Sequence, residues 1–186
     1  SLTALSSDTA PKNWSVQRQK DHKPPILPSE FGFVSENGAY YIDKNVSEED
    51  KVIYLTFDAG YENGNIERIL DVMKKHDVKG AFFILENLIN RNPELVLRMK
   101  DEGHLICNHT AKHPDMTKIT DLDNFKNQLS RLEKAYFTLT GEEMPKIYRP
   151  PEGRFAEQNL KFAHELGYRT IFWSFAYADW DNNKQM

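Results

Sequence analysis

Short apolar runs alternate with amphipathic segments along most of this chain. Five runs rich in β-branched and aromatic residues have the length of buried strands, at residues 52–57, 81–85, 104–108, 147–149 and 168–173. Between them, apolar residues recur three and four positions apart, as on one face of a helix, in residues 66–73, 93–99, 122–139 and 157–166. The pattern therefore predicts strands and helices in alternation.

Residues that begin and end helices support these boundaries. Asn92 and Pro93 form a cap followed by proline at the first helical position, and Gly141 and Gly167 each follow a predicted helix. Alternating strands and helices indicate parallel strands with right-handed crossovers, so we predict an α/β fold that is either a barrel or an open doubly wound sheet. In both folds, functional sites form at the carboxyl ends of the strands.

The first 50 residues lack this regular pattern. They mix Ser, Lys, Asp and Pro, and the prolines disfavour regular structure. We predict an extended N-terminal arm over residues 1–50, anchored by Trp14, Phe31 and Phe33, and a single catalytic domain over residues 51–186.

Composition narrows the function classes. A length of 186 residues with 39% hydrophobic content suits one domain with a substantial core. The formal charge is −4, from 24 basic and 28 acidic residues without a basic block, so we expect no nucleic-acid partner. No run approaches the ~20 apolar residues of a membrane span. The single cysteine, Cys107, lies in an apolar run and is predicted to be a core residue.

Polar clusters follow three of the predicted strands. His109 and His113 are spaced so that two imidazoles could bind one metal ion, although such pairs also arise from packing alone. Asp58 could act as a general base, or it could simply cap a turn. Arg149 could hold a carboxylate in a bidentate grip and favour its ionised form, or it could form a surface ion pair. Because all three clusters lie at strand ends, we expect them to converge.

The last aromatic residues could contact sugar. Trp173, Tyr177 and Trp180, with Asp179, could form a wall against the apolar faces of pyranose rings, although aromatic clusters more often belong to the core.

These clusters resemble the motifs of a known family. They are Thr56-Phe57-Asp58-x-Gly60, His109-Thr110-x-x-His113, Arg149-x-Pro151-x-Gly153 and Trp173-Ser174…Asp179-Trp180. In order and approximate spacing they resemble the polysaccharide deacetylases, the NodB-homology domain of carbohydrate esterase family 4. The run Gly60-Tyr61-Glu62-Asn63-Gly64 and parts of the arm resemble the branch that acts on muramic acid during δ-lactam formation in the spore cortex.

The resemblance implies a distorted (β/α) barrel and metal-dependent hydrolysis of an acetyl group. It implies that Asp58 is the general base, that His109 and His113 are metal ligands, and that Arg149 orients the base. It further implies that Glu152 and Gly153 contact substrate, with the backbone N–H of Glu152 facing the oxyanion. By the same resemblance Asp179 supports the catalytic centre, and Tyr177 and Trp180 line the sugar site.

Two departures from the family pattern affect these expectations. The family usually has a second aspartate, a metal ligand, where this chain has Ala59, so we expect zinc to be weakly held unless Glu62 or Asn63 replaces that ligand. The family also places an acid histidine in a later Leu-His motif, which does not occur before Met186. We therefore assign that role to no histidine, and we expect the barrel to lack its last strands in this chain.

The resemblance leads to a functional hypothesis with one main rival. We expect a secreted or envelope-associated, monomeric peptidoglycan N-deacetylase that binds a divalent metal and uses MurNAc as its substrate. The rival is a pseudo-deacetylase that binds glycan without hydrolysing it. An unrelated hydrolase or phosphatase is disfavoured, since the chain has neither a G-x-S-x-G elbow nor a P-loop.

Overall fold

The centre of the fold is a parallel sheet. The computed structural model describes residues 8–47, 49–177 and 179. Six parallel strands pair in the order β2-β8-β6-β5-β4-β3. The strands are β2 (Ala39–Tyr40), β3 (Thr56–Ala59), β4 (Ala81–Ile84), β5 (Leu105–Asn108), β6 (Ile147–Tyr148) and β8 (Arg169–Ile171). The prediction of an α/β fold with parallel strands is confirmed. Over the described residues the sheet remains open, with β2 and β3 at its edges.

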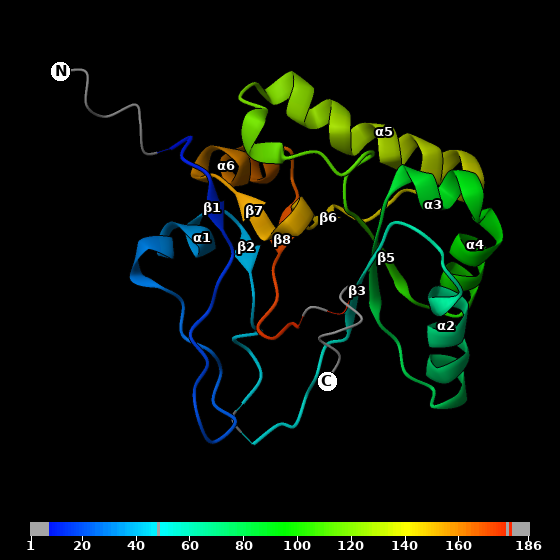
Figure 1. The fold of residues 1–186 in the computed structure, drawn as a ribbon, viewed down its shortest axis with the longest axis horizontal. Helices are drawn as coiled ribbons and strands as arrows, with labels where there is room; N and C mark the ends of the chain where they lie inside the picture. Colours follow the sequence, from blue (N-terminus) through cyan, green and yellow to red (C-terminus); the bar gives the residue numbers. More distant parts are fainter. Residues whose placement is uncertain (1–7, 48, 178, 180–186) are drawn as a thin grey trace.

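Helices flank this sheet (Figure 1). They are α2 (Asn65–Lys75), α3 (Glu86–Arg91), α4 (Pro93–Asp101), α5 (Leu122–Thr140) and α6 (Glu157–Glu165), with the 3₁₀ turns η2 (Met116–Lys118) and η3 (Pro151–Gly153). The longest, α5, begins where the Asp121 side chain accepts the Asn124 N–H at 2.8 Å, and it ends at Gly141, whose φ is +72°. Both ends follow the expected capping chemistry.

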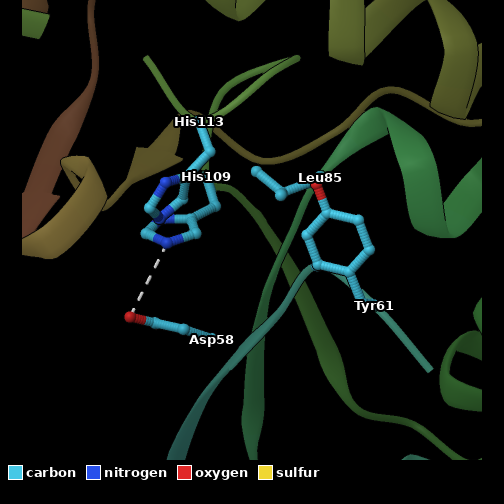
Figure 2. A pocket seen from close by; sticks show the side chains of 6 residues that line it. Asp58, Tyr61, Leu85, His109 and His113 are labelled. Atoms are coloured by element: carbon cyan, nitrogen blue, oxygen red, sulfur yellow. Dashed lines mark ion pairs between the residues drawn. The ribbon is translucent and has the colours of Figure 1, made fainter. Parts of the chain in front are cut away.

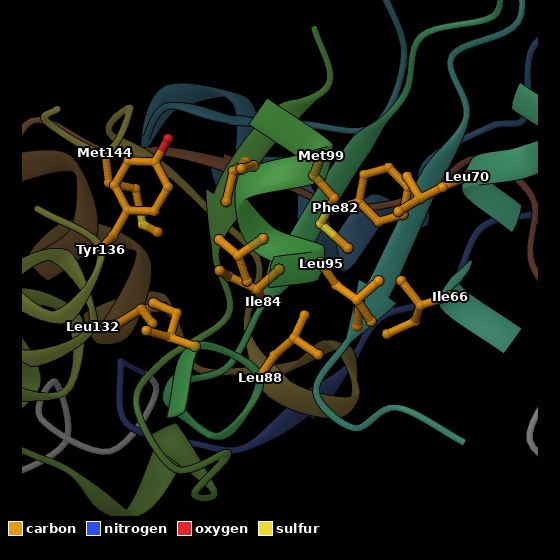
Figure 3. Close-up of a cluster of buried hydrophobic side chains, with 14 of the residues drawn as sticks. Ile66, Leu70, Phe82, Ile84, Leu88, Leu95, Met99, Leu132, Tyr136 and Met144 are labelled. Atoms are coloured by element: carbon orange, nitrogen blue, oxygen red, sulfur yellow. The ribbon is translucent and has the colours of Figure 1, made fainter. Parts of the chain in front are cut away.

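The main core lies between the sheet and the helices α2 to α5. Figure 3 shows Phe82 and Ile84 of β4 against Leu70, Leu95 and Met99 from the flanking helices. All five side chains are buried. Each such side chain stabilises the fold by roughly 1.5–3 kcal/mol through burial, which holds the strand ends in fixed positions.

The N-terminal arm is more structured than the sequence predicts. It contains β1 (Lys12–Asn13), η1 (Ser29–Phe31), α1 (Phe33–Glu36) and β2, and β1 pairs antiparallel with β7 (Arg154–Phe155). The prediction of a simple extended arm is therefore wrong. Elements of two to four residues are too short to leave a periodic pattern, and β2 is stabilised by pairing with the distant strand β8.

The predicted anchors of the arm are confirmed. Trp14 and Phe31 are buried, and Phe33 packs against them. The Trp14 ring stacks on Phe172 with centroids 4.1 Å apart, and its Nε1–H donates to the Trp173 carbonyl at 2.8 Å. We call these residues, with Val34, Ala39, Phe155 and Leu160, the arm cluster. It joins the arm to the strands nearest the end of the described chain.

One predicted strand is displaced. The run 52–57 was expected to be a buried strand, but β3 begins only at Thr56. The side chains of residues 52–55 are exposed, Ile53 to 83%. The reason is position: β3 is an edge strand, so this run lacks a neighbour on one side in the described part of the chain.

Candidate active site

Arg149, which follows β6, connects three strands through one buried guanidinium. Its Nη1 donates to Asp58 Oδ1 at 2.8 Å, its Nη2 to Thr56 Oγ1 at 2.9 Å, and its Nε to the Ile171 carbonyl at 3.0 Å. Neither predicted alternative is correct in full: Asp58 is held through one nitrogen and not two, and Arg149 is buried, so the pair is not a surface ion pair. Thr56 takes the second nitrogen because it lies two residues from Asp58, on the same face of β3.

Two aromatic rings hold the same guanidinium. Its central carbon lies 4.1 Å from the Phe83 ring centroid and 5.6 Å from that of Trp173. A guanidinium over aromatic faces gains cation–π attraction while its edge stays available for hydrogen bonds. Arg149 is consequently a fixed positive charge that orients the partly exposed Asp58 carboxylate.

His109 follows β5 and faces Asp58. Its Nδ1 lies 2.8 Å from the Arg149 carbonyl oxygen, which can only accept, so Nδ1 carries the proton in the neutral ring. The Nε2 lone pair then faces Asp58 Oδ2, 3.7 Å away (Figure 2). Burial lowers the pKa of His109, because the imidazolium loses hydration there. The ring is thus held neutral, the state that ligates metals.

A strained loop brings His113 beside His109. Thr110 has φ +76° and His113 has φ +56°, both in the left-handed region that few side chains adopt. The His113 N–H donates to Thr110 Oγ1 at 2.9 Å, and the Thr110 N–H donates to Asn108 Oδ1 at 2.8 Å. With the loop fixed in this way, the two imidazole centroids lie 5.0 Å apart.

These side chains surround a hollow of about 180 Å³. Its lining residues are Asp58, Gly60, Tyr61, Leu85, His109 and His113. In Figure 2 the imidazoles and Asp58 form one side, and Tyr61 and Leu85 form the other. We call this the first hollow. It places a carboxylate and two imidazoles around a space that admits a small polar group.

The donors fit a divalent metal in kind but not in number. Two imidazoles are suitable ligands, and a second hydrogen bond fixes the tautomer of His109. No group of three His, Cys, Asp or Glu that could hold a metal ion occurs among the described residues.

Neither Glu62 nor Asn63, the two expected substitutes for the missing ligand, supplies a third metal ligand in this structure. The carboxylate of Glu62 accepts the N–H groups of Gly64 and Ile66, the latter at 3.1 Å, and so caps α2. Asn63 is exposed and does not line the first hollow. Ala59 is buried in the main core, on the opposite face of β3 from Asp58.

The polysaccharide deacetylase family model matches residues 45–171. The chain belongs to this family. The predicted resemblance is thereby confirmed.

Relatives of known name agree with this family assignment. The chain is 41% identical over 176 residues to a peptidoglycan-N-acetylmuramic acid deacetylase, PdaA, of Bacillus subtilis, covering 94% of this chain and 65% of that protein. It is 35% identical over 179 residues to a peptidoglycan-N-acetylglucosamine deacetylase of Bacillus cereus, covering 96% of this chain and 62% of that protein. The chain therefore spans less than two thirds of the length of these two relatives.

A solved structure of PdaA, described as a family 4 carbohydrate esterase, shows the same fold. It superposes with a TM-score of 0.87 at 39% identity and covers 94% of this chain and 74% of that one. At this level of similarity the family's arrangement of strands is shared across almost the whole chain.

The remaining motif residues lie outside the first hollow. Glu152, with φ +59°, is exposed, and Gly153, with φ +63°, is buried against the Trp173 and Trp14 side chains. Tyr177 and Asp179 are exposed beyond β8, and the described lining of the hollow includes neither. Trp180 falls outside the described residues. Their roles in the family site stay predictions.

Sequence reasoning missed three residues of the site. Thr56 holds the second nitrogen of Arg149, and Tyr61 and Leu85 line the first hollow. Thr56 and Tyr61 were present in the quoted motifs, and the two-residue spacing of Thr56 from Asp58 is a usable signal. Leu85 is an ordinary apolar residue at the end of β4, so the sequence offers no signal for it.

Proposed function

We propose that this chain removes the N-acetyl group from the MurNAc residues of peptidoglycan, in the formation of muramic δ-lactam in the spore cortex, with a divalent metal, zinc, as cofactor. The observation that carries the proposal is the Arg149–Asp58–His109 arrangement, a fixed carboxylate beside two imidazoles in a hollow. Relatives named as peptidoglycan deacetylases support the substrate class. A peptidoglycan substrate suits a secreted or envelope-associated protein.

The residues of the first hollow suggest how hydrolysis proceeds. Asp58, oriented by Arg149, removes a proton from the attacking water as its oxygen bonds to the acetyl carbon. The carbon–nitrogen bond then breaks, and the same carboxyl group can return the proton to the leaving amine, so that acetate and a free amine result. His109 and His113 would hold the metal, which when bound polarises the acetyl carbonyl.

A pseudo-deacetylase is less well supported than an enzyme. Ala59 removes a ligand, but the base, its orienting arginine and both imidazoles remain together.

The proposal is tested by replacing the base. Asp58→Asn keeps an oxygen that can accept from Arg149 but cannot take a proton, so acetate release from peptide-free glycan strands should fall by about 10²–10⁴-fold. Release is measured with and without added zinc. The control is Asp77→Asn, at an exposed carboxylate that is 93% accessible and remote in sequence from the site motifs. Equal acetate release from Asp58→Asn and the parent would refute this role, and none from the parent would favour the pseudo-deacetylase.

The described part of the chain has no helix with the length and apolar character that crossing a bilayer requires.

A further inference from the structure

A second, larger hollow adjoins the first. It has a volume of about 370 Å³ and shares Tyr61 and Leu85 with the first hollow. Its other lining residues are Glu86, Asn87, Asn90, Ala111, Lys112 and Arg131. Asn87 ties the two together, because its Nδ2 donates to the Gly60 carbonyl at 3.2 Å and Gly60 lines the first hollow. A ligand group in the second hollow is therefore next to whatever occupies the first.

The second hollow carries a net positive charge. Arg131 Nη2 lies 2.8 Å from Glu86 Oε2, so these two charges neutralise each other. Lys112 is exposed, and among the described residues it forms no ion pair with a carboxylate. The amide groups of Asn87 and Asn90 add neutral hydrogen-bond donors to the same wall. One cation and two amides form a lining suited to a carboxylate.

The chemistry of the substrate supplies such a carboxylate in the right place. On an amino sugar the N-acetyl group is on C2, and the neighbouring oxygen is O3. In muramic acid O3 carries a lactyl ether ending in a carboxylate, whereas in glucosamine O3 is a plain hydroxyl. With the acetyl group beside Asp58, the O3 substituent leaves the adjacent ring carbon and is close enough to reach a space that adjoins the first hollow.

We propose that the second hollow binds the lactyl carboxylate of a muramic acid residue, with Lys112 as its cationic contact. This inference rests on the proposed function, and it names the residue that separates muramic acid from glucosamine. Arg131 stays paired with Glu86 and shapes the wall.

The test compares two glycans that differ only in this group. One is a peptide-free MurNAc-containing tetrasaccharide, and the other is the same tetrasaccharide with its lactyl carboxyl groups converted to amides. Affinities are measured by calorimetry with a chelator present, so that hydrolysis does not interfere. The parent should bind the carboxylate form about fivefold more tightly, as expected for one partly exposed ion pair, and the difference should shrink as salt is added.

Matched variants identify the cation. Lys112→Gln should abolish the preference and Lys112→Arg should retain it, whereas Lys126→Gln, which removes the same charge from an exposed position on α5, should leave it unchanged. Equal affinity of the parent for both glycans, or an unchanged preference in Lys112→Gln, would overturn the inference. Acetate release is assayed in parallel with zinc. If no glycan releases acetate, the proposed function is refuted. A binding preference that is lost only in Lys112→Gln would still support the carboxylate site.

Discussion

At the scale of single residues, one arginine organises the candidate site. Arg149 contacts Asp58 and Thr56 of β3 and the Ile171 carbonyl of β8, and its own carbonyl accepts from His109. The predicted base and a predicted metal ligand are therefore positioned by the same residue, one through its side chain and the other through its backbone. A shift of Arg149 would move both at once.

Ala59 provides a test of the predicted weak metal site. Ala59→Asp introduces a carboxylate beside the apolar core, so the metal-free variant should unfold at a lower temperature than the parent. In the family this position supplies a metal ligand, which requires the carboxylate to turn out of the core toward the imidazoles. Added zinc should then bind more tightly than to the parent and restore stability, because ligand binding to the folded state stabilises it. Calorimetric titration and thermal unfolding with and without zinc measure both effects. Identical zinc affinity in the two proteins would show that this position does not reach the metal.

At the scale of elements, strand ends determine where the chemistry lies. Asp58 is the last residue but one of β3, His109 directly follows β5 and Arg149 directly follows β6. Parallel strands bring these ends to one edge of the sheet, so the alternating pattern of the sequence suffices to predict their convergence. The hydrogen bonds between them confirm that prediction.

Other features could not be predicted from the sequence for physical reasons. The capping role of Glu62 depends on the path of the chain around Gly64, a geometry that composition does not show. The short strand β2 exists because β8 pairs with it, and that contact joins residues 131 positions apart. The exposure of residues 52–55 depends on which strand lies at the edge of the sheet. The last two features are decided by partners distant in sequence.

A buried histidine at the start of β5, the end opposite to the candidate site, should make the stability of the protein depend on pH. His104 is buried just before β5, and its Nδ1 accepts the Gly80 N–H at 3.2 Å. Burial lowers its pKa, although Glu102 opposes this. Below about pH 6.5 the unfolded chain therefore takes up a proton that the folded chain refuses, and stability falls as the pH drops.

Replacing His104 by asparagine isolates the contribution of this histidine to the pH dependence of stability. His104→Asn keeps an acceptor for Gly80 but does not titrate, so its melting temperature should fall less than the parent's between pH 7 and pH 5. His76→Asn, at an exposed histidine, is the control and should behave like the parent. A parallel decline in parent and His104→Asn would exclude His104 as the source.

At the scale of the whole molecule, the arm is part of the folded structure. β1 pairs with β7, β2 extends the main sheet, and the arm cluster packs Trp14 between elements from both ends of the described chain. The Trp14 backbone N–H donates to the carbonyl of Gly153, within the Arg149 motif, at 2.8 Å. The arm therefore supports the same loop that carries Arg149.

Removing the arm's main anchor should destabilise the protein as a unit. Trp14→Ala should lower the free energy of unfolding by about 3–5 kcal/mol, as for other buried aromatic residues. Trp14→Phe keeps the stacking on Phe172 and loses the hydrogen bond to Trp173, so its loss should be smaller. Urea unfolding followed by circular dichroism measures both. A change below about 0.5 kcal/mol in Trp14→Ala would mean that the arm does not contribute to folding.

The exposed run beside β3 has a consequence for handling the protein. Val52, Ile53, Tyr54 and Leu55 lie exposed just before β3, which is an edge strand among the described residues, and an unpaired edge can template strand pairing between molecules. Two molecules that meet along this run would bury apolar surface that each leaves in water when alone. We therefore expect self-association of concentrated samples to involve this run, and a net charge of −4 offers only weak repulsion against it.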